Sequence, residues 1–587
     1  MKTLISKLAA LMLITALIAA CGVKNKQQDQ PEQQNLQSIA VPEPEDEAEE
    51  LPIAESEKSS IKFVPPVISS DEEIQTSVAD AINIDDQTEI YATDIQEHKT
   101  IIMERSEPLA YMKIERDGAE EYSSFKENEF MLAQSKPLST FSIDVDAASY
   151  SNVRRFINQG RKPNPDAVRI EEMINYFDYQ YPEPQGADPV YISTEVGSAP
   201  WNKDHRLVKI GLKAKEISLD KLPNSNFVFL IDVSGSMSGA TRLDLVKSSM
   251  KMLLNNLRDA DRVAIVVYAN EVGVKLESTP VKNKEKIIQV LDRLTASGGT
   301  SGGDGIQQAY KVAEKNFIKG GNNRIILCTD GDFNIGISND AELERMIERK
   351  RESGVFLSIL GYGMGNYKDK KMQTLAQAGN GNHAYIDNLQ EANKVLVKEF
   401  SGTMHTLAKD VKIQVEFNPG KVQAYRLVGY ETRKLNKEDF NDDTKDAGEM
   451  GVGHTVTALY EVVPTGVKSN LVPSVDELKY QPDAKIKTDF GTSNELLTVK
   501  VRYKEPDGDT SKLLSKAVID NGENKTSQDF CFASAVAMYG QLLRNSKYKG
   551  DADYSKVITL AQQGLNHDKD GYRREFVRLV ETTKSLD

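Results

Sequence analysis

The chain has 587 residues, enough for several domains, and its composition excludes two large classes of protein. A formal net charge of -15 argues against a nucleic-acid partner, because proteins that bind nucleic acids carry basic surfaces. Three cysteines are too few for a disulfide scaffold. Cys328 and Cys531 lie inside apolar patterns and are predicted to be small buried side chains.

Residues 1–20 are predicted to form a signal peptide. Two lysines precede an apolar run at 8–20 that is too short and too early for a stable spanning helix. The sequence Ile-Ala-Ala-Cys21 that ends this run resembles a bacterial lipobox. The resemblance implies cleavage before Cys21 and lipidation of that cysteine, and two or three acyl chains would anchor the chain firmly. The alternative is a plain secretory signal in which the cysteine occurs by chance.

The segment 21–108 is predicted to be a lipidated, acidic, disordered tether. It is rich in Gln, Glu, Asp, Pro and Ser and contains the acidic block 43–50, so it cannot bury enough apolar surface to order itself. We therefore expect a lipid-anchored protein of the bacterial cell envelope. Cys21 is followed by Gly22 rather than by the Asp that retains lipoproteins at the inner membrane of enteric bacteria, which favours the outer membrane.

A small α+β unit is predicted at 109–185. It contains one alternating strand, 140–146, and two helices that are expected to be capped by Asp146 and Asp166. The segment 186–223 alternates apolar and polar residues, as half-buried strands of an antiparallel sheet do. These strands are expected to pair with the sandwich that is predicted later in the chain.

The central part of the chain, 224–402, is predicted to be a doubly wound, Rossmann-like α/β domain. Its first strand is a run of apolar residues, 227–232, typical of a strand that is buried on both faces of a parallel sheet. Further strands are expected at 262–268, 272–278, 324–329, 355–360 and 383–387, and helices at 243–257, 282–294, 304–318, 339–353, 368–377 and 389–400.

Oxygen-bearing side chains are predicted to gather where strands of this domain end. Asp232, Ser234 and Ser236 occupy alternate positions of one tight turn and suit a hard cation such as Mg²⁺. A Gly-rich loop with Thr300 and a buried strand that ends before Asp330 complete the pattern. The set resembles the von Willebrand factor type A domain with its metal-ion-dependent adhesion site. The resemblance implies that these five residues lie near a divalent ion, with Asp330 bound directly or through water.

The chain after the central domain is predicted to form a β-sandwich, 403–520, and a helical C-terminal region, 521–587. The sandwich prediction rests on strictly alternating segments at 411–417, 424–430, 456–462 and 497–503. Because alternating strands lie on both sides of the central domain, we expect that domain to be inserted in the sandwich.

Several segments of the flanking regions resemble one family of bacterial lipoproteins with a von Willebrand factor type A domain. The resemblance covers most of the chain from about residue 137 onward and implies an architecture more than a function. The segments are Ser142–Ser149, Glu171–Phe177, Gly451–Tyr460 and Gly571–Phe576.

Binding of a protein partner is the function that the A-domain resemblance implies. An ion that is held by hydroxyls and few charged ligands stays electrophilic and keeps a coordination position open. The Asp or Glu carboxylate of an envelope or extracellular protein can fill this position. Mg²⁺ is the expected ion, with Mn²⁺ or Ca²⁺ as alternatives. A structural envelope protein whose metal only stiffens the fold is a second interpretation.

Enzymatic activity is not expected. The elbow of serine hydrolases requires Gly-x-Ser-x-Gly, whereas Gly235 to Gly239 places Met237 at the position of the nucleophile. A catalytic triad also needs a histidine after a late strand, but His383 begins a strand and is expected to be structural. The Gly-rich loop, 298–305, lacks the Gly-Lys-Ser/Thr ending of a phosphate-binding loop. A hydrolase is therefore the weakest interpretation.

Overall fold

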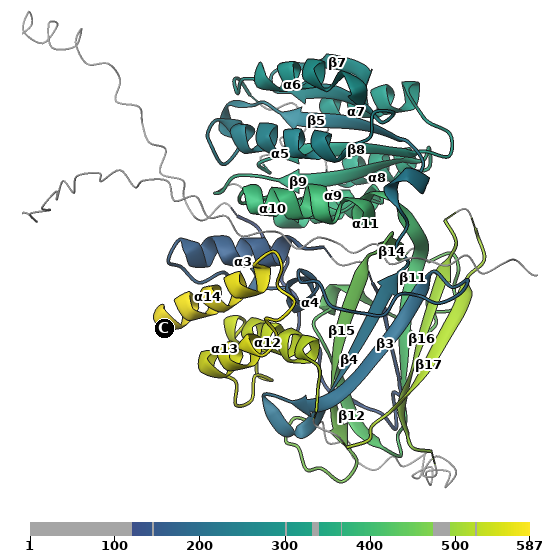
Figure 1. The fold of residues 1–587 in the computed structure, drawn as a ribbon. Coiled ribbons are helices and arrows are strands. Elements are labelled where there is room, and N and C mark those ends of the chain that lie inside the picture. Colours follow the sequence, from purple (N-terminus) through teal and green to yellow (C-terminus); the bar gives the residue numbers. More distant parts are fainter. Residues whose placement is uncertain are drawn as a thin grey trace, which may run out of the picture. The chain divides into compact units, whose positions relative to one another are not determined.

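The described part of the chain folds into three sheets and two sets of helices (Figure 1). The computed structural model describes residues 120–587 except 144–145, 300–301, 332–339, 366, 446, 473–492, 507 and 523–524. The expected signal peptide, the lipidation site Cys21, the tether and the expected ligand Thr300 lie outside the described residues. None of the helices in the described ranges combines the length and the apolar character that crossing a bilayer requires.

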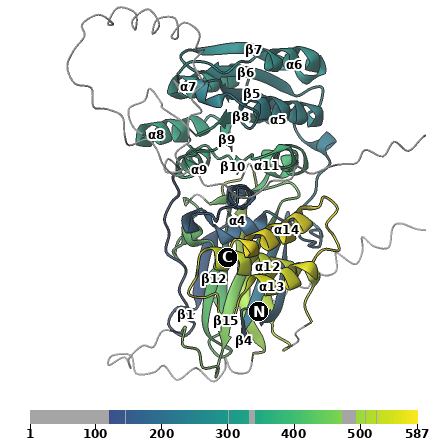
Figure 2. The same ribbon diagram turned by 90° about the vertical axis from the view of Figure 1, so that its left-hand side faces the viewer.

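The central domain, 224–402, which we call the A domain, is a sheet with helices on both faces, so the predicted doubly wound fold is confirmed. The strand order is β10-β9-β8-β5-β6-β7, and all neighbours are parallel except β7, which runs antiparallel to β6. Figure 2 shows the strands stacked in this order between two layers of helices. The strands are β5 (Ser225–Asp232), β6 (Arg262–Tyr268), β7 (Val272–Pro280), β8 (Asn322–Thr329), β9 (Val355–Gly361) and β10 (His383–Tyr385). One face is covered by α5 (Leu243–Asn256), α6 (Lys284–Asp292), α10 (Leu389–Asn393) and α11 (Phe400–Met404), the other by α7 (Gly302–Lys315), α8 (Asp340–Arg351) and α9 (Asp369–Ala378).

The apolar run of β5 follows from its place in the middle of this sheet. Phe229 and Ile231 point into the core beneath α5, while Val228 and Leu230 point into the core beneath α7. Every residue of the strand is buried. A strand between two helix layers needs apolar side chains at consecutive positions, and this need is the signal in the sequence.

The last helix of the A domain differs from the single helix expected at 389–400. After α10, a π-helical turn spans Lys394–Lys398, and α11 follows. The backbone N–H of Glu399 donates to the carbonyl oxygen of Lys394 at 2.9 Å, and the two side chains form an ion pair. The Lys394 ammonium also lies 4.6 Å from the ring centroid of Tyr176. The wider turn places residues five apart on one face, so that the buried Lys394 ammonium contacts the Glu399 carboxylate.

Two sheets pack face to face as the predicted β-sandwich. Side chains such as Val208, Val415 and Val499 fill the space between them. The A domain is inserted in this sandwich, because β4, which precedes it, pairs over eight residues with β15, which follows it. One sheet has the order β1 (Met131–Leu132), β12 (Val422–Val428), β15 (Thr455–Pro464), β4 (Asn202–Ala214) and β3 (Val190–Ala199); the other has β13 (Lys434–Leu435), β2 (Leu138–Ser142), β11 (Thr406–Phe417), β16 (Glu495–Lys504) and β17 (Lys512–Ile519), with β14 (Gly448–Gly451) also paired to β11.

A layer of helices covers one sheet of the sandwich, and we call the two together the base. The helices share one core with Leu207 of β4 and Leu459 of β15. Residues 109–185 were expected to form a separate small unit, but β2 is paired on both sides with sandwich strands, and α3 and α4 pack with the C-terminal helices. The apolar side chains of α3 and α4 belong to one core with those of the C-terminal helices, so these segments do not form a unit of their own. The helices are α3 (Ala148–Asn158), α4 (Ile170–Asn175), α12 (Gln528–Leu543), α13 (Tyr554–Gln562) and α14 (Tyr572–Ser585).

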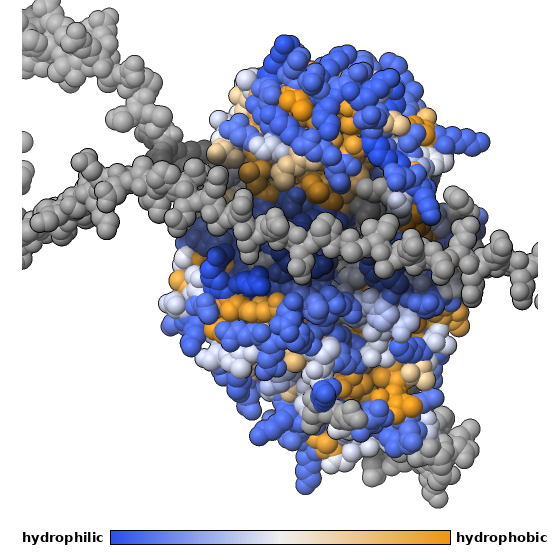
Figure 3. Space-filling view, viewed as in Figure 1, coloured by the Kyte–Doolittle hydropathy of each residue, from blue (hydrophilic) through white to orange (hydrophobic). Residues whose placement is uncertain are grey.

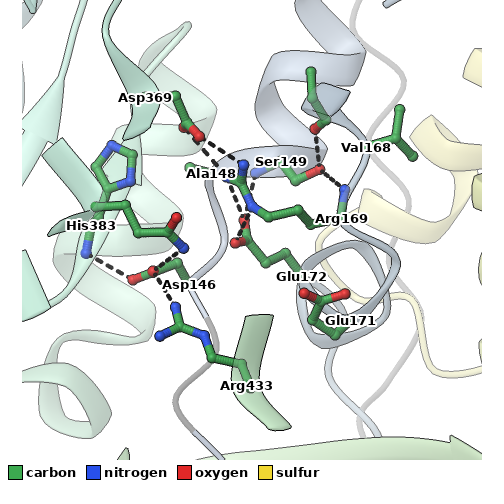
Figure 4. A network of polar contacts seen from close by, with 12 residues as sticks. Asp146, Ala148, Ser149, Val168, Arg169, Glu171, Glu172, Asp369, His383 and Arg433 are labelled. Atoms are coloured by element: carbon green, nitrogen blue, oxygen red, sulfur yellow. Dashed lines mark hydrogen bonds and ion pairs between the residues drawn. The ribbon is translucent and has the colours of Figure 1, made fainter. Parts of the chain in front are cut away.

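Neither of the two expected helix caps is a cap. Asp166 lies inside a short 3₁₀ turn, and the side chain of Asn164 accepts its backbone N–H. Asp146 precedes α3 but makes no capping bond; it accepts the backbone N–H of His383 at 3.0 Å and a guanidinium N–H of Arg433 at 3.1 Å (Figure 4). This buried carboxylate joins the base to the A domain, because Arg433 belongs to the base and His383 to the A domain. The charged guanidinium of Arg433 binds the carboxylate more strongly than the N–H groups of a helix end would.

Buried ion pairs continue this junction between the base and the A domain. Arg169 of the base donates to Asp369 of α9 at 2.7 Å and also binds Glu172, and all three side chains are buried (Figure 4). Arg154 of α3 likewise donates to Glu391 of α10 at 2.8 Å. Because buried ion pairs need good geometry to offset desolvation, these contacts define one orientation of the A domain on the base.

Candidate metal centre

Three of the predicted ligands lie in the turn after β5. Asp232 ends the strand, and its Oδ1 accepts the backbone N–H of Ser234 at 2.9 Å. The hydroxyl oxygens of Ser234 and Ser236 lie 3.0 Å apart. Met237 of the same turn is fully buried in the core beneath α5. The buried methionine thus holds a turn in which the three oxygen-bearing side chains come together.

Asp232 is held in one orientation by residues of two neighbouring strands. Its Oδ2 accepts the hydroxyl of Tyr268, the last residue of β6, at 3.1 Å and the hydroxyl of Thr329, the last residue of β8, at 3.2 Å. The backbone N–H of Gly331 in turn donates to the Thr329 hydroxyl oxygen at 3.2 Å. The carboxylate is fully buried. Its position is therefore set before any cation arrives.

Asp330 follows β8 directly and places a second buried carboxylate at the same edge. The nearest guanidinium nitrogen, Nε of Arg242, is 3.9 Å from Asp330 Oδ2, and Arg242 also donates to the carbonyl oxygen of Met364 at 2.8 Å. Burial raises the pKa of Asp232 to about 6, and the neighbouring charge of Asp330 adds to the increase. Two buried carboxylates that repel each other would be stabilised by a divalent cation.

The Gly-rich loop lies against the turn. The backbone N–H of Ser297 donates to the carbonyl oxygen of Val233 at 2.8 Å, and the N–H of Gly235 donates to the carbonyl oxygen of Gly298 at 2.9 Å. Gly298 has a φ of +80°, a conformation that favours glycine. Thr300 itself is outside the described residues, so its role as a ligand stays a prediction. The loop nevertheless contacts the turn through Gly298, two residues before the undescribed pair begins.

The side chains at this edge fit a hard cation. Carboxylates and hydroxyls are the ligands that Mg²⁺, Mn²⁺ and Ca²⁺ prefer, and water completes their coordination. Within the described ranges, no group of three or more His, Cys, Asp or Glu side chains comes together that could hold a metal. Among the described residues, this edge brings together two carboxylates and neutral hydroxyls, so it differs from an all-carboxylate cage and leaves room for a ligand from another molecule.

Sequence reasoning missed three residues of this centre. Tyr268 and Thr329 orient Asp232, and Arg242 approaches Asp330. The role of Tyr268 could in principle have been predicted, since this residue ends the neighbouring strand in register with Asp232. Arg242 gave no signal, because its approach to Asp330 depends on the path of the loop before α5.

Large apolar side chains are rarely exposed on the surface of the described residues. On the face seen in Figure 3, hydrophilic side chains predominate and apolar ones form separate patches. Five large apolar side chains are exposed within the described ranges. They are Phe317, Leu389, Leu513, Ile519 and Leu586.

Comparison with protein families assigns most of the described chain. A family described as von Willebrand factor type A domain matches residues 226–399, and one described as von Willebrand factor matches 116–209. A third, described as the C-terminal part of the uncharacterized protein YfbK, matches 402–586. Domains of the von Willebrand type A family commonly bind a divalent metal at the strand edge described above.

The chain is also similar to individual proteins. The chain is 45% identical over 475 residues to the uncharacterized protein YfbK of Escherichia coli (strain K12), which covers 80% of this chain and 82% of the relative. It is 28% identical over 258 residues to the uncharacterized protein sll0103 of Synechocystis, covering 43% of this chain and 59% of the relative. A solved von Willebrand factor type A structure from Catenulispora acidiphila matches 67% of this chain and 91% of its own, with 16% identity and a TM-score of 0.36.

Proposed function

We propose that this chain, which belongs to the family of the uncharacterized protein YfbK and carries a von Willebrand factor type A domain, binds a protein partner through a divalent cation. The observation that carries the proposal is the convergence of Asp232, Ser234, Ser236 and Asp330 at one sheet edge. Two of these are buried carboxylates, and the others are hydroxyls that leave a cation short of ligands.

The proposed binding step uses these residues in distinct ways. Asp232 supplies the charge that holds the cation, with Tyr268 and Thr329 fixing its orientation. The hydroxyls of Ser234 and Ser236 supply neutral oxygens. Bound there, a divalent ion would accept an additional carboxylate, which an Asp or Glu of the partner provides. Mg²⁺ is the ion we propose, with Mn²⁺ and Ca²⁺ as alternatives.

The setting that we propose for this binding is the bacterial cell envelope. It rests on the signal peptide, the lipidation site Cys21 and the acidic tether predicted from the sequence. The partner would be an envelope or extracellular protein, and the outer membrane is the expected membrane. We propose no catalytic activity: the ring of His383, the histidine considered for a triad, is buried and bonded at Nε2 to the Tyr367 hydroxyl at 2.8 Å.

A capture experiment tests the proposal directly. The full chain is immobilised and exposed to envelope extract in Mg²⁺ or in chelator, and the Asp232→Ala variant is treated in the same way. We expect a partner that is retained in Mg²⁺ and lost both with chelator and with Asp232→Ala. Asp244→Ala is the matched control, because Asp244 is an exposed carboxylate in the first turn of α5.

The second interpretation, a purely structural metal, gives a different result in the same experiment. In that case chelator lowers the melting temperature of the chain, but every captured protein is retained equally with and without Mg²⁺. A partner that survives both chelator and Asp232→Ala would therefore contradict metal-mediated binding.

A further inference from the structure

A hollow of about 570 Å³ lies beside the candidate metal centre on the A domain. Val233 and Ser297, which contact each other at the metal-site turn, both line it. Its apolar lining includes Leu294, which is buried, and Val290, which is partly buried. The hollow thus adjoins the turn that would hold the cation.

Two cations line the hollow, Lys275 of β7 and Arg293 after α6. Both are exposed, and neither forms an ion pair with a carboxylate in the described part of the chain. Their neighbours in sequence are paired: Asp292 binds Lys251 at 2.5 Å, for example. One carboxylate, Glu271, also lines the hollow. In a chain with a net charge of -15, two cations beside one carboxylate form a local site for anionic groups.

The register of the sheet gives the distance between the metal site and these cations. Asp232 of β5 lies opposite Tyr268 of β6, which lies opposite Val272 of β7. Neighbouring strands are about 4.8 Å apart and a strand rises about 3.3 Å per residue, so Lys275 lies about 14 Å from Asp232, backbone to backbone. An extended peptide spans this distance in about four residues.

We propose that the partner presents an extended acidic segment with two carboxylates about four residues apart. One carboxylate binds the cation at Asp232, the other binds Lys275 and Arg293, and an apolar side chain between them occupies the hollow over Val290 and Leu294. The inference rests on the proposed function, because it assumes a metal-bound carboxylate. It adds the chemical class of the partner segment and the two residues that select it.

The probes for this inference are short peptides with blocked ends, so that only side chains carry charge. The first is Glu-Gly-Val-Gly-Glu, the second has Gln in place of the last Glu, and the third has the two Glu residues adjacent. Each carries a fluorophore, and its binding to the full chain is measured by anisotropy in Mg²⁺ and in chelator. The double variant Lys275→Gln/Arg293→Gln is compared with Lys286→Gln, an exposed lysine of α6 that does not line the hollow.

The spaced peptide is expected to bind about two- to fivefold more tightly than either other peptide, because an exposed ion pair contributes about this much to binding. Salt screens such a pair and should reduce this advantage. The double variant should lose the advantage and leave binding of the single-carboxylate peptide unchanged, whereas Lys286→Gln should change nothing. If all three peptides bind equally in Mg²⁺ and are released by chelator, this inference is wrong and the proposed function stands. If no peptide binds in a Mg²⁺-dependent way, the proposed function fails, and this inference fails with it.

Discussion

Replacing Asp369 by Asn should weaken the junction between the A domain and the base far more than an ordinary surface substitution. Asp369 and its partner Arg169 have side-chain exposures of 1% and 4%, and they meet at 2.7 Å. Burial is the largest influence on the pKa of Asp369 and raises it, but the charge and hydrogen bonds of Arg169, together with His383 and Tyr367, outweigh burial and keep the pKa below its usual range, so the pair is ionic at neutral pH. Removing one partner of a buried ion pair typically costs about 3–5 kcal/mol. Glu172 also binds Arg169, which places the expected loss near the lower value, about 3 kcal/mol.

A matched substitution on the neighbouring helix sets the scale. Asp340 of α8 binds Lys371 at 2.7 Å, but the Asp340 side chain is 72% exposed. Asp340→Asn should therefore cost at most about 1 kcal/mol, although its ion pair has the same length. Comparing the two variants separates the effect of burial on stability from the effect of ion-pair distance, since both variants remove the same charge.

The assay is urea unfolding of the full chain followed by two signals. The only tryptophan, Trp201, is buried in the core of the base, so its fluorescence reports on the base, whereas circular dichroism reports on all helices. Asp369→Asn should shift the first transition to lower urea and separate the two signals as the domains uncouple. If Asp369→Asn and Asp340→Asn shift the transitions equally, the argument from burial is refuted.

Three further predictions concern the anchor, the cation and pH. Cys21→Ser should release the chain from the membrane fraction or leave an uncleaved precursor, and unchanged mature size and fractionation would rule out the lipid anchor. Asp232→Ala should remove most Mg²⁺ affinity in calorimetry, whereas Ser234→Ala deletes one neutral oxygen and should have a milder effect; equal losses would contradict the assigned roles. Burial lowers the pKa of His405 to about 4, so the folded state disfavours the protonated form that the unfolded chain acquires below about pH 6.5. Stability should thus decrease as pH falls from 6.5 towards 4, by up to about 3 kcal/mol, and His405→Gln should flatten this part of the profile in urea unfolding at each pH.

Local patterns predicted the A domain well because its signals are short in sequence. The apolar run of β5 and the alternation of strands with helices reflect burial between two helix layers, and this burial leaves a periodic pattern. The turn with Asp232, Ser234 and Ser236 was predictable for the same reason, since its residues are adjacent. The role of Tyr268 requires the register between β5 and β6, which periodicity alone does not specify.

The architecture of the base could not be predicted in the same way. Gln414 of β11 donates to Thr140 of β2 across 274 residues of sequence, and no local pattern identifies that pairing. Asp146 gave the signal of a helix cap, because a carboxylate before a helix favours that role. Its actual partners, Arg433 and the backbone of His383, come from distant segments and become visible only in the folded chain.

The insertion of the A domain gives the chain a particular mechanical design. The domain is entered from the end of β4 and left through the start of β11, and these strands belong to different sheets of the sandwich. A pull on the A domain by a bound partner is thus divided between two sheets. Inside each sheet the load would run along the strands, so that the ladder bonds of β4 with β15 and of β11 with β16 resist it together rather than one after another. The sandwich would therefore be loaded in shear, the direction in which paired β-strands must break many hydrogen bonds at once.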